Sequence, residues 1–306
     1  MTRRTMAALV ALDLLWLTFL AFALADRRYH QRDPVFGVNQ WGYRGEARAE
    51  REPGEIRVAL VGGSAAYEAG LPNEATLASS LFFELRNAGS PSNQEYSVVN
   101  LAEPGVAADS YVDAIRRYAF LDPDVVVIFD GYDRFTGVPP HARERSLVFR
   151  STGYLPILPA RWLGRPGWLS DPDADVSEIL RDGAGGDASC SGASSAYCAA
   201  MIDAVRTILD QGRRAIVVSP PSISPRHAQE QQSLAAALAR AFDREPRFLY
   251  VDAGSAADLT KPVNSPDGVH RTNVGNHDIG QRVAQELLKM LGSSRPRLTA
   301  RSGGSR

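Results

Sequence analysis

The run Ile56-Arg57-Val58-Ala59-Leu60-Val61, followed directly by Gly62-Gly63-Ser64, sets the pattern for most of this chain. A short apolar run rich in β-branched residues predicts a buried strand, and the two glycines predict a tight turn at its end. Four similar runs follow, at 97–101, 124–129, 214–219 and 248–252. The sequence therefore predicts five strands.

Stretches with helical periodicity separate these strands. They lie at 74–88, 108–120, 196–212, 226–243 and 273–291, and Asn273 is expected to cap the last of them. Strands that alternate with helices indicate βαβ units and a parallel sheet. We expect an α/β fold, a three-layer α/β/α sandwich around a five-stranded parallel, flavodoxin-like sheet, with its site beyond the carboxyl ends of the strands.

Composition limits the size of the fold and the class of partner. The chain has 306 residues, of which 44% are hydrophobic and 23% charged, so it can form one large core or two modest domains. Its formal net charge is -1, and this balance offers no electrostatic reason to expect a nucleic-acid partner.

The N-terminus is long and apolar enough to span a bilayer. From Thr5 to Ala25 the only polar interruptions are Asp13 and Thr18. Ala23-Leu24-Ala25 also has the small-x-small form of a signal-peptidase site, so segment 1–25 is either a signal anchor or a cleaved signal peptide. Both interpretations predict export, with the domain outside the cytoplasm.

Three further segments follow the apolar one. Segment 26–54 is expected to be a connecting arm whose Trp41 and Tyr43 dock on the domain, because free aromatic side chains would be costly to expose. The α/β domain is expected at 55–292, with an insertion at about 134–194 that either shapes a substrate groove or is a surface excursion. Residues 293–306 are expected to be a disordered tail.

Two cysteines, Cys190 and Cys198, lie close together in sequence rich in Gly, Ser and Ala. In an exported chain this spacing predicts a disulfide that closes a small loop. A zinc site is not expected there, since neither histidine nor further cysteine lies nearby.

Asp267-Gly268-Val269-His270 and Ser64 are the candidates for chemistry. Serine is a weak nucleophile that needs an adjacent base, and the base needs a partner that fixes its tautomer. His270 and Asp267 can supply both, because a spacing of three lets one turn direct both side chains to one point. His277-Asp278 has the form of a metal-binding pair but lacks further ligands, and the Gly62-Gly63 turn lacks the Lys-Ser/Thr of a phosphate-binding loop. No metal or cofactor is expected.

In chain order these motifs resemble the SGNH, or GDSL-like, hydrolases. The four conserved blocks of that family are similar to 61–64, 98–105, 127–133 and 267–270 of this chain. The upstream segment 37–45 also looks like the arm of membrane-anchored members. Outside the insertion, the resemblance covers about 34–290.

The resemblance implies a catalytic triad of Ser64, Asp267 and His270 that cleaves an ester through an acyl-serine intermediate. It also implies an oxyanion hole formed by the N–H groups of Ser64 and Gly105. Where the family carries a donating asparagine, this chain has Asp133, an acceptor when ionised. Either Asp133 is protonated and donates, or the charge of the transition state is stabilised elsewhere, for instance by a bound cation.

Three functions stay open on this resemblance. The first is hydrolysis of an acylated small molecule or polysaccharide, with O-acetyl groups on cell-surface or secreted carbohydrate as the expected substrate. The second is acyl transfer to a sugar hydroxyl at the same site, which depends on how well the pocket excludes water. The third is a glycan-binding or assembly protein with impaired catalysis, which Asp133 favours.

Overall fold

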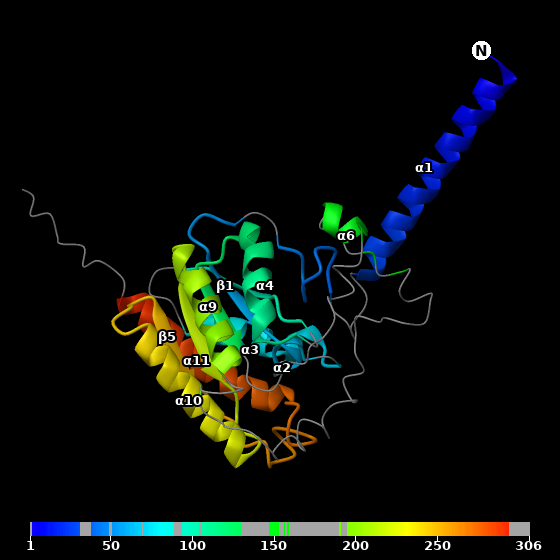
Figure 1. The fold of residues 1–306 in the computed structure, drawn as a ribbon. Helices are drawn as coiled ribbons and strands as arrows, with labels where there is room; N and C mark the ends of the chain where they lie inside the picture. The colour runs from blue at the N-terminus through cyan, green and yellow to red at the C-terminus, as the bar shows by residue number, and fades with distance from the viewer. Residues whose placement is uncertain are drawn as a thin grey trace, which may run out of the picture.

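The computed structural model describes residues 2–30, 38–48, 51–68, 70–88, 94–103, 106–129, 147–152, 156, 158, 190 and 195–293. Most of the expected insertion and the tail from 294 onward lie outside this set. The described domain is a parallel sheet between two helical layers, and the helix α1, Arg3–His30, projects away from it (Figure 1).

All five expected strands are present within two residues of their predicted bounds. They are β1 (Ile56–Gly62), β2 (Tyr96–Asn100), β3 (Val125–Phe129), β4 (Arg214–Ser219) and β5 (Phe248–Asp252). The strands are all parallel and their order is β2-β1-β3-β4-β5, the flavodoxin-like arrangement that the sequence predicts. The order reverses between β1 and β3, where such sheets bind ligands.

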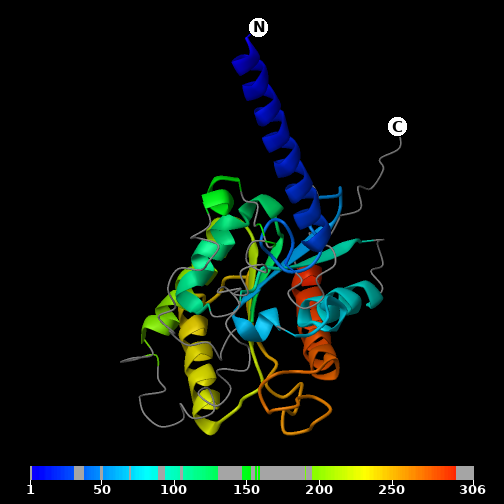
Figure 2. The same ribbon diagram turned by 90° about the vertical axis from the view of Figure 1, so that its right-hand side faces the viewer.

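Alternate strand residues build the two cores. Val58 and Leu60 of β1 face one core with α3 (Leu77–Asn87) and α11 (Asn273–Ser293), while Ala59 and Val61 face the other. Figure 2 views the sheet between these layers, with α11 and α3 on one side and α4 and α10 on the other. The second layer comprises α4 (Tyr111–Arg117), α9 (Ser195–Asp210) and α10 (Pro225–Ala241). Burial on both faces explains the continuous apolar runs of the strands.

Three helix predictions need correction. The helix expected at 108–120 consists of two 3-10 turns, η2 (Ala108–Ser110) and η3 (Ala119–Leu121), on either side of α4. The one expected at 74–88 is divided at Thr76 into η1 (Asn73–Ala75) and α3, because the Thr76 hydroxyl accepts the Ser79 N–H and caps α3. At α11 the capping hydroxyl belongs to Thr272, one residue before the expected Asn273, and it accepts the N–H of Gly275.

The arm packs on the domain. Val38, Tyr43 and Arg44 are buried, and Arg44 bridges to Asn100 at the end of the edge strand β2. Tyr43 also stacks edge-on against Tyr118, with ring centroids 5.7 Å apart. The arm thus contributes Val38 and Tyr43 to the core, whereas Trp41, which was also expected to dock, is 37% exposed.

A disulfide joins Cys190 to Cys198, with the two Cα atoms 5.7 Å apart. Cys198 is buried in α9, so the bond fastens the chain that enters this helix to the second core. Both cysteines are therefore structural in the described part of the chain.

Helix α1 is apolar over its whole circumference. Its segment Arg3–Arg28 is long enough to cross a membrane and contains an 18-residue window with a mean hydropathy of 2.2 and no buried residue. Large side chains such as Trp16 and Phe19 are more than 60% exposed along it. The helix runs without a break through Ala23–Ala25, and the buried Asp26 accepts the N–H of Leu158 at 2.7 Å.

Candidate functional site

Ser64 lies at the carboxyl end of β1, where the sequence predicted it. It is half-buried and opens a helix of only four residues, α2 (Ser64–Tyr67), with Gly63 as the N-terminal cap. A side chain at Gly62 would bring a Cβ within 2.2 Å of the Phe129 carbonyl oxygen. The glycine is therefore required by the close approach of β1 and β3 at the strand end that precedes Ser64.

Asp267 and His270 face each other within one turn. The Nδ1 atom of His270 lies 2.6 Å from Oδ2 of Asp267, and both side chains are about a third exposed (35% and 34%). The other carboxylate oxygen accepts the N–H groups of Val269 and His270, at 2.9 and 2.7 Å. Because the carboxylate of Asp267 accepts from Nδ1–H, the neutral form of the ring has the tautomer in which Nε2 can accept a proton.

The carboxylate of Asp267 is held in its ionised form. Burial raises its pKa, but the hydrogen bonds from the His270 ring and from two backbone N–H groups outweigh burial and place the pKa below the ordinary value. At neutral pH the group is therefore a negative partner for the imidazole.

The histidine turn and the serine helix are in direct contact. Arg271, which follows His270, donates through Nη2 to the carbonyl oxygen of Ala65, which follows Ser64. The same nitrogen lies 2.8 Å from Oε1 of Glu68. Two motifs about 200 residues apart in the chain are thus brought to the same edge of the sheet.

Two further side chains hold α2 and were not singled out from the sequence. Arg44 of the arm donates through Nη1 to the carbonyls of Tyr67 and Glu68, at 2.6 and 2.9 Å. Asn100, the last residue of β2, donates to the carbonyl of Ala66 at 3.0 Å. The Arg44–Asn100–Arg271 set is recognisable only in three dimensions, because no spacing links its members.

The predicted oxyanion residues Gly105 and Asp133 lie outside the described residues, and their roles stay predictions. The chain that leads to Gly105 does reach the site, since the N–H of Glu103 donates to the carbonyl of Gly62 at 3.0 Å.

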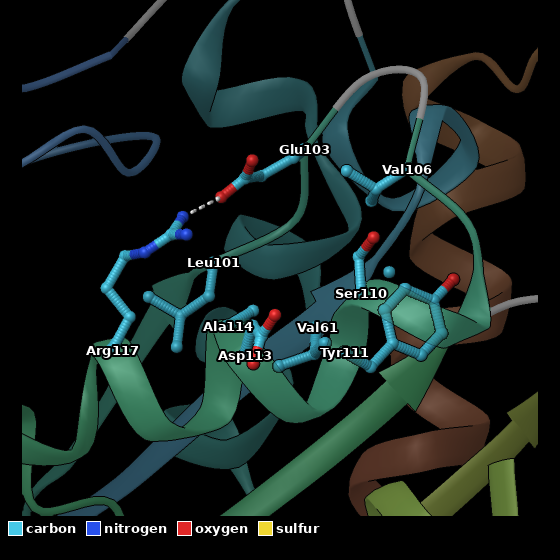
Figure 3. Close-up of a pocket in the computed structure, with 10 residues that line it drawn as sticks. Val61, Leu101, Glu103, Val106, Ser110, Tyr111, Asp113, Ala114 and Arg117 are labelled. Atoms are coloured by element: carbon cyan, nitrogen blue, oxygen red, sulfur yellow. Dashed lines mark hydrogen bonds and ion pairs between the residues drawn. The ribbon is translucent and has the colours of Figure 1, made fainter. Parts of the chain in front are cut away.

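A small hollow lies beside Gly62, between the end of β1 and α4. It has a volume of about 30 Å³ and is lined in part by Leu101, Ser110 and Tyr111. Figure 3 shows Arg117 reaching from α4 to the buried Glu103 at its rim, with 3.4 Å between Nη1 and Oε1. This ion pair fixes Glu103, the last described residue before Gly105.

The remaining histidines of interest have structural contacts. His227 is buried in the first turn of α10, where Nδ1 accepts the N–H of Ile223. His277 pairs with Glu84 of α3 at 3.5 Å, three residues before Gly280, where α11 packs closely on Ser80.

Among the residues that the structure describes, no group of three His, Cys, Asp or Glu side chains is arranged to hold a metal ion.

Fold and site together define a doubly wound α/β protein with a serine at the first strand end and a paired histidine in a turn that contacts the serine helix. No protein-family model matches the chain, and no curated protein sequence matches it. Solved structures do resemble it. One is described as a G-D-S-L family lipolytic protein from Desulfitobacterium hafniense DCB-2, with 13% identity, a TM-score of 0.46, and coverage of 75% of this chain and 98% of that one.

Two others are described as esterases. A psychrotrophic esterase from Pseudoalteromonas sp. is 11% identical, with a TM-score of 0.45 and coverage of 77% of this chain and 98% of that one. A family 3 carbohydrate esterase from Clostridium thermocellum is 11% identical, with a TM-score of 0.46 and coverage of 78% and 98%. These likenesses concern the fold alone.

Proposed function

We propose that this protein is a membrane-anchored serine hydrolase of the SGNH type, which cleaves an ester through an acyl-serine intermediate. The contact that carries the proposal is the hydrogen bond from Arg271 to the Ala65 carbonyl, which sets the His270 turn against the helix that Ser64 opens. The ionised Asp267 completes the chain of groups that a serine nucleophile needs.

The reaction follows from these roles. Ser64 Oγ attacks the ester carbonyl carbon as His270 Nε2 takes the hydroxyl proton, and Asp267 stabilises the imidazolium that forms. The tetrahedral intermediate collapses, the alcohol leaves with the proton from Nε2, and the acyl group stays on Ser64. Water then repeats the sequence, with His270 as base, and releases the acid.

Asp133 sets the expected strength of catalysis. Loss of an oxyanion donor lowers turnover on the order of 100- to 1000-fold, and an ionised carboxylate about 4 Å from the oxyanion adds roughly 4 kcal/mol of repulsion at an effective dielectric of 20. We therefore propose a weakened or specialised hydrolase. A sugar hydroxyl in place of water would make the same site an acyltransferase.

For the substrate we propose O-acyl groups, acetyl above all, on cell-surface or secreted carbohydrate. The support is the family resemblance together with α1, which has the length and hydropathy of a membrane span. We further propose that α1 is retained rather than cleaved, because the helix is continuous through Ala25 and the next residue, Asp26, is buried and hydrogen-bonded. The domain then lies outside the cytoplasm, in a periplasmic or extracellular space.

The first test is the intact mass of the full chain in detergent after incubation with a fluorophosphonate. We expect one adduct on the parent, none on Ser64→Ala, and labelling about 100-fold faster on Asp133→Asn, because an asparagine N–H replaces a repelling carboxylate. An adduct that persists in Ser64→Ala would contradict the assignment of the nucleophile.

The same experiment separates the second candidate function. A glycan-binding or assembly protein that retains the fold has no activated serine, and Asp133 favours this alternative. If neither the parent nor Asp133→Asn forms an adduct, the binding function is supported and hydrolysis is rejected. If only Asp133→Asn forms one, the serine is activated in the parent but its oxyanion hole prevents the reaction.

A further inference from the structure

The helix that carries Ser64 is too short to hold its own conformation. α2 has four residues, whereas isolated helices below roughly 12–15 residues are marginal in water. The last four carbonyls of any helix also lack partners within it, and here they are the carbonyls of the whole helix. The direction of Ser64 therefore depends on what these four groups bind.

Each of the four carbonyls has a partner, and three partners are side chains from distant segments. The N–H of Glu68 donates to Ser64, Arg271 to Ala65, Asn100 to Ala66 and Arg44 to Tyr67. The arm, the end of β2 and the histidine turn thus each donate to one carbonyl of the nucleophile helix. Of these three, only Arg271 also adjoins the proposed base.

The guanidinium of Arg271 is fixed in several directions. Nε donates to Oδ1 of Asn276 in α11 at 2.7 Å, and the group stacks over the Phe129 ring at 4.6 Å from its centroid. Its side chain is 1% exposed. A group held by α11 and β3 while it binds α2 transmits the position of one element to the other.

The ion pair with Glu68 is not an evident source of stability. Glu68 is buried, and burial raises its pKa above the ordinary value despite the nearby Arg271, the Leu77 N–H and Arg44. Buried pairs of this kind commonly contribute little net stability, because both charges lose their hydration. Its location beside Ser64 suggests a role in alignment.

We propose that Arg271 is a positioning residue, which aligns His270 with Ser64 by binding the helix that Ser64 opens while it is anchored on β3 and α11. The inference rests on the proposed function, since alignment matters only if the two residues react together. Through this one side chain, a displacement of the nucleophile helix is coupled to a displacement of the base.

The test compares Arg271→Ala with Arg57→Ala in the full chain in detergent. Arg57 is the matched control, because it is also buried, also pairs with a buried glutamate and also donates to a backbone carbonyl, but at the opposite end of β1. We expect the fluorophosphonate labelling rate of Arg271→Ala to fall on the order of 100-fold, as a displacement of about 1 Å produces. Arg57→Ala should label within about threefold of the parent at temperatures where both variants are folded.

Chemical rescue separates alignment from general damage. Methylguanidinium can occupy the space that Arg271→Ala leaves, and we expect it to restore labelling at least about tenfold there and not in Arg57→Ala. If Arg271→Ala does not fold, Arg271→Lys replaces it, with an expected loss of about tenfold because one ammonium cannot reproduce the fork of donors. Labelling of either Arg271 variant at the parent rate, or equal slowing in Arg57→Ala, would overturn the inference.

A second readout does not depend on the fluorophosphonate reaction. In the NMR spectrum of the full chain with isotope-labelled histidines, we expect Ser64→Ala to shift the His270 ring signals, which are assigned by their loss in His270→Gln. We expect this shift to disappear when Arg271→Ala is added. If the parent does not react with the fluorophosphonate but the His270 shift still depends on Arg271, the proposed hydrolysis fails while the inference holds. A His270 response to Ser64→Ala that is the same with and without Arg271 would overturn the inference.

Discussion

Two buried arginine–glutamate pairs lie near the two ends of β1, and they differ in how the glutamate is held. At the start of the strand, Arg57 binds Glu55 through two nitrogens, at 3.0 and 3.1 Å. Ser97 and the N–H of Glu52 add two more donors to the same carboxylate. Although burial raises the pKa of Glu55, these donors outweigh it and lower the pKa to about 2.

Beyond the end of the strand, Glu68 has a less complete set of donors. Arg271 offers one nitrogen to Oε1, and Leu77 donates its N–H to Oε2 at 2.6 Å. The same nitrogen of Arg271 also binds the Ala65 carbonyl, and its Nε binds Asn276. Burial therefore prevails at Glu68 and its pKa is raised.

The comparison separates two uses of the same chemistry. In the Glu55–Arg57 pair, two nitrogens of the guanidinium bind the carboxylate, and this pair stabilises the fold. In the Glu68–Arg271 pair, the guanidinium also contacts α2, α11 and β3, and it holds the nucleophile helix in place. Substitution of Arg57 or Glu55 should thus lower stability, and substitution of Arg271 should lower activity.

Asp267→Asn should give the largest effect and should act at the site alone. An amide presents the wrong group to His270 Nδ1 and favours the tautomer that cannot accept the serine proton, a change that costs roughly 10⁴-fold in comparable triads. We expect the labelling rate to fall by about this factor while the midpoint of thermal unfolding changes by about 2 °C or less. A variant that keeps a tenth or more of the parent rate would remove Asp267 from the proposed triad.

Glu55→Gln should show the opposite behaviour. The lowered pKa of Glu55 corresponds to a contribution of about 2 kcal/mol to the free energy of unfolding at neutral pH, once solvent screening is allowed for. We expect urea unfolding at pH 7 to show a loss of this size, with labelling within about threefold of the parent. A loss of labelling that exceeds the loss of folded protein would show that the Glu55–Arg57 pair also acts on the candidate site.

Glu68→Gln should give the smallest effect, best seen in the pH dependence of unfolding. Because the folded-state pKa of Glu68 is raised, its contribution is fully present below the ordinary value of 4.5 and is lost as the pH rises through the raised value. Glu55 has the reverse sign, since its contribution is present above 4.5 and is lost as the pH falls toward 2.

Urea unfolding of the full chain between pH 2.5 and 7 should resolve both signs. Glu68→Gln should flatten the decline of stability above pH 4.5, and Glu55→Gln should flatten the decline below it. An unchanged curve above pH 4.5 in Glu68→Gln would show that its neighbours fully compensate its burial.

The elements of the fold follow from local sequence where one physical cause dominates. The apolar runs of β1, from Val58 onward, and of β3 predicted strands because a strand buried on both faces needs a continuous apolar sequence. The helix expected at 108–120 was wrong as a single element, since periodicity does not show the 3-10 turns before and after α4. The cap of α11 was one residue off, because Thr272 and Asn273 are both good capping residues.

The sequence by itself determined where the candidate residues lie along the fold. A serine follows the first strand, and an aspartate and a histidine lie three residues apart in one turn before the last helix. Their mutual contact is local, so residue spacing could predict it. Only the tertiary structure decided how the serine helix is held. Arg44, Asn100 and Arg271 converge on α2 from sequence positions up to 206 residues away. A helix of four residues cannot satisfy its own carbonyls, so its orientation depends on whichever donors the finished fold brings to it.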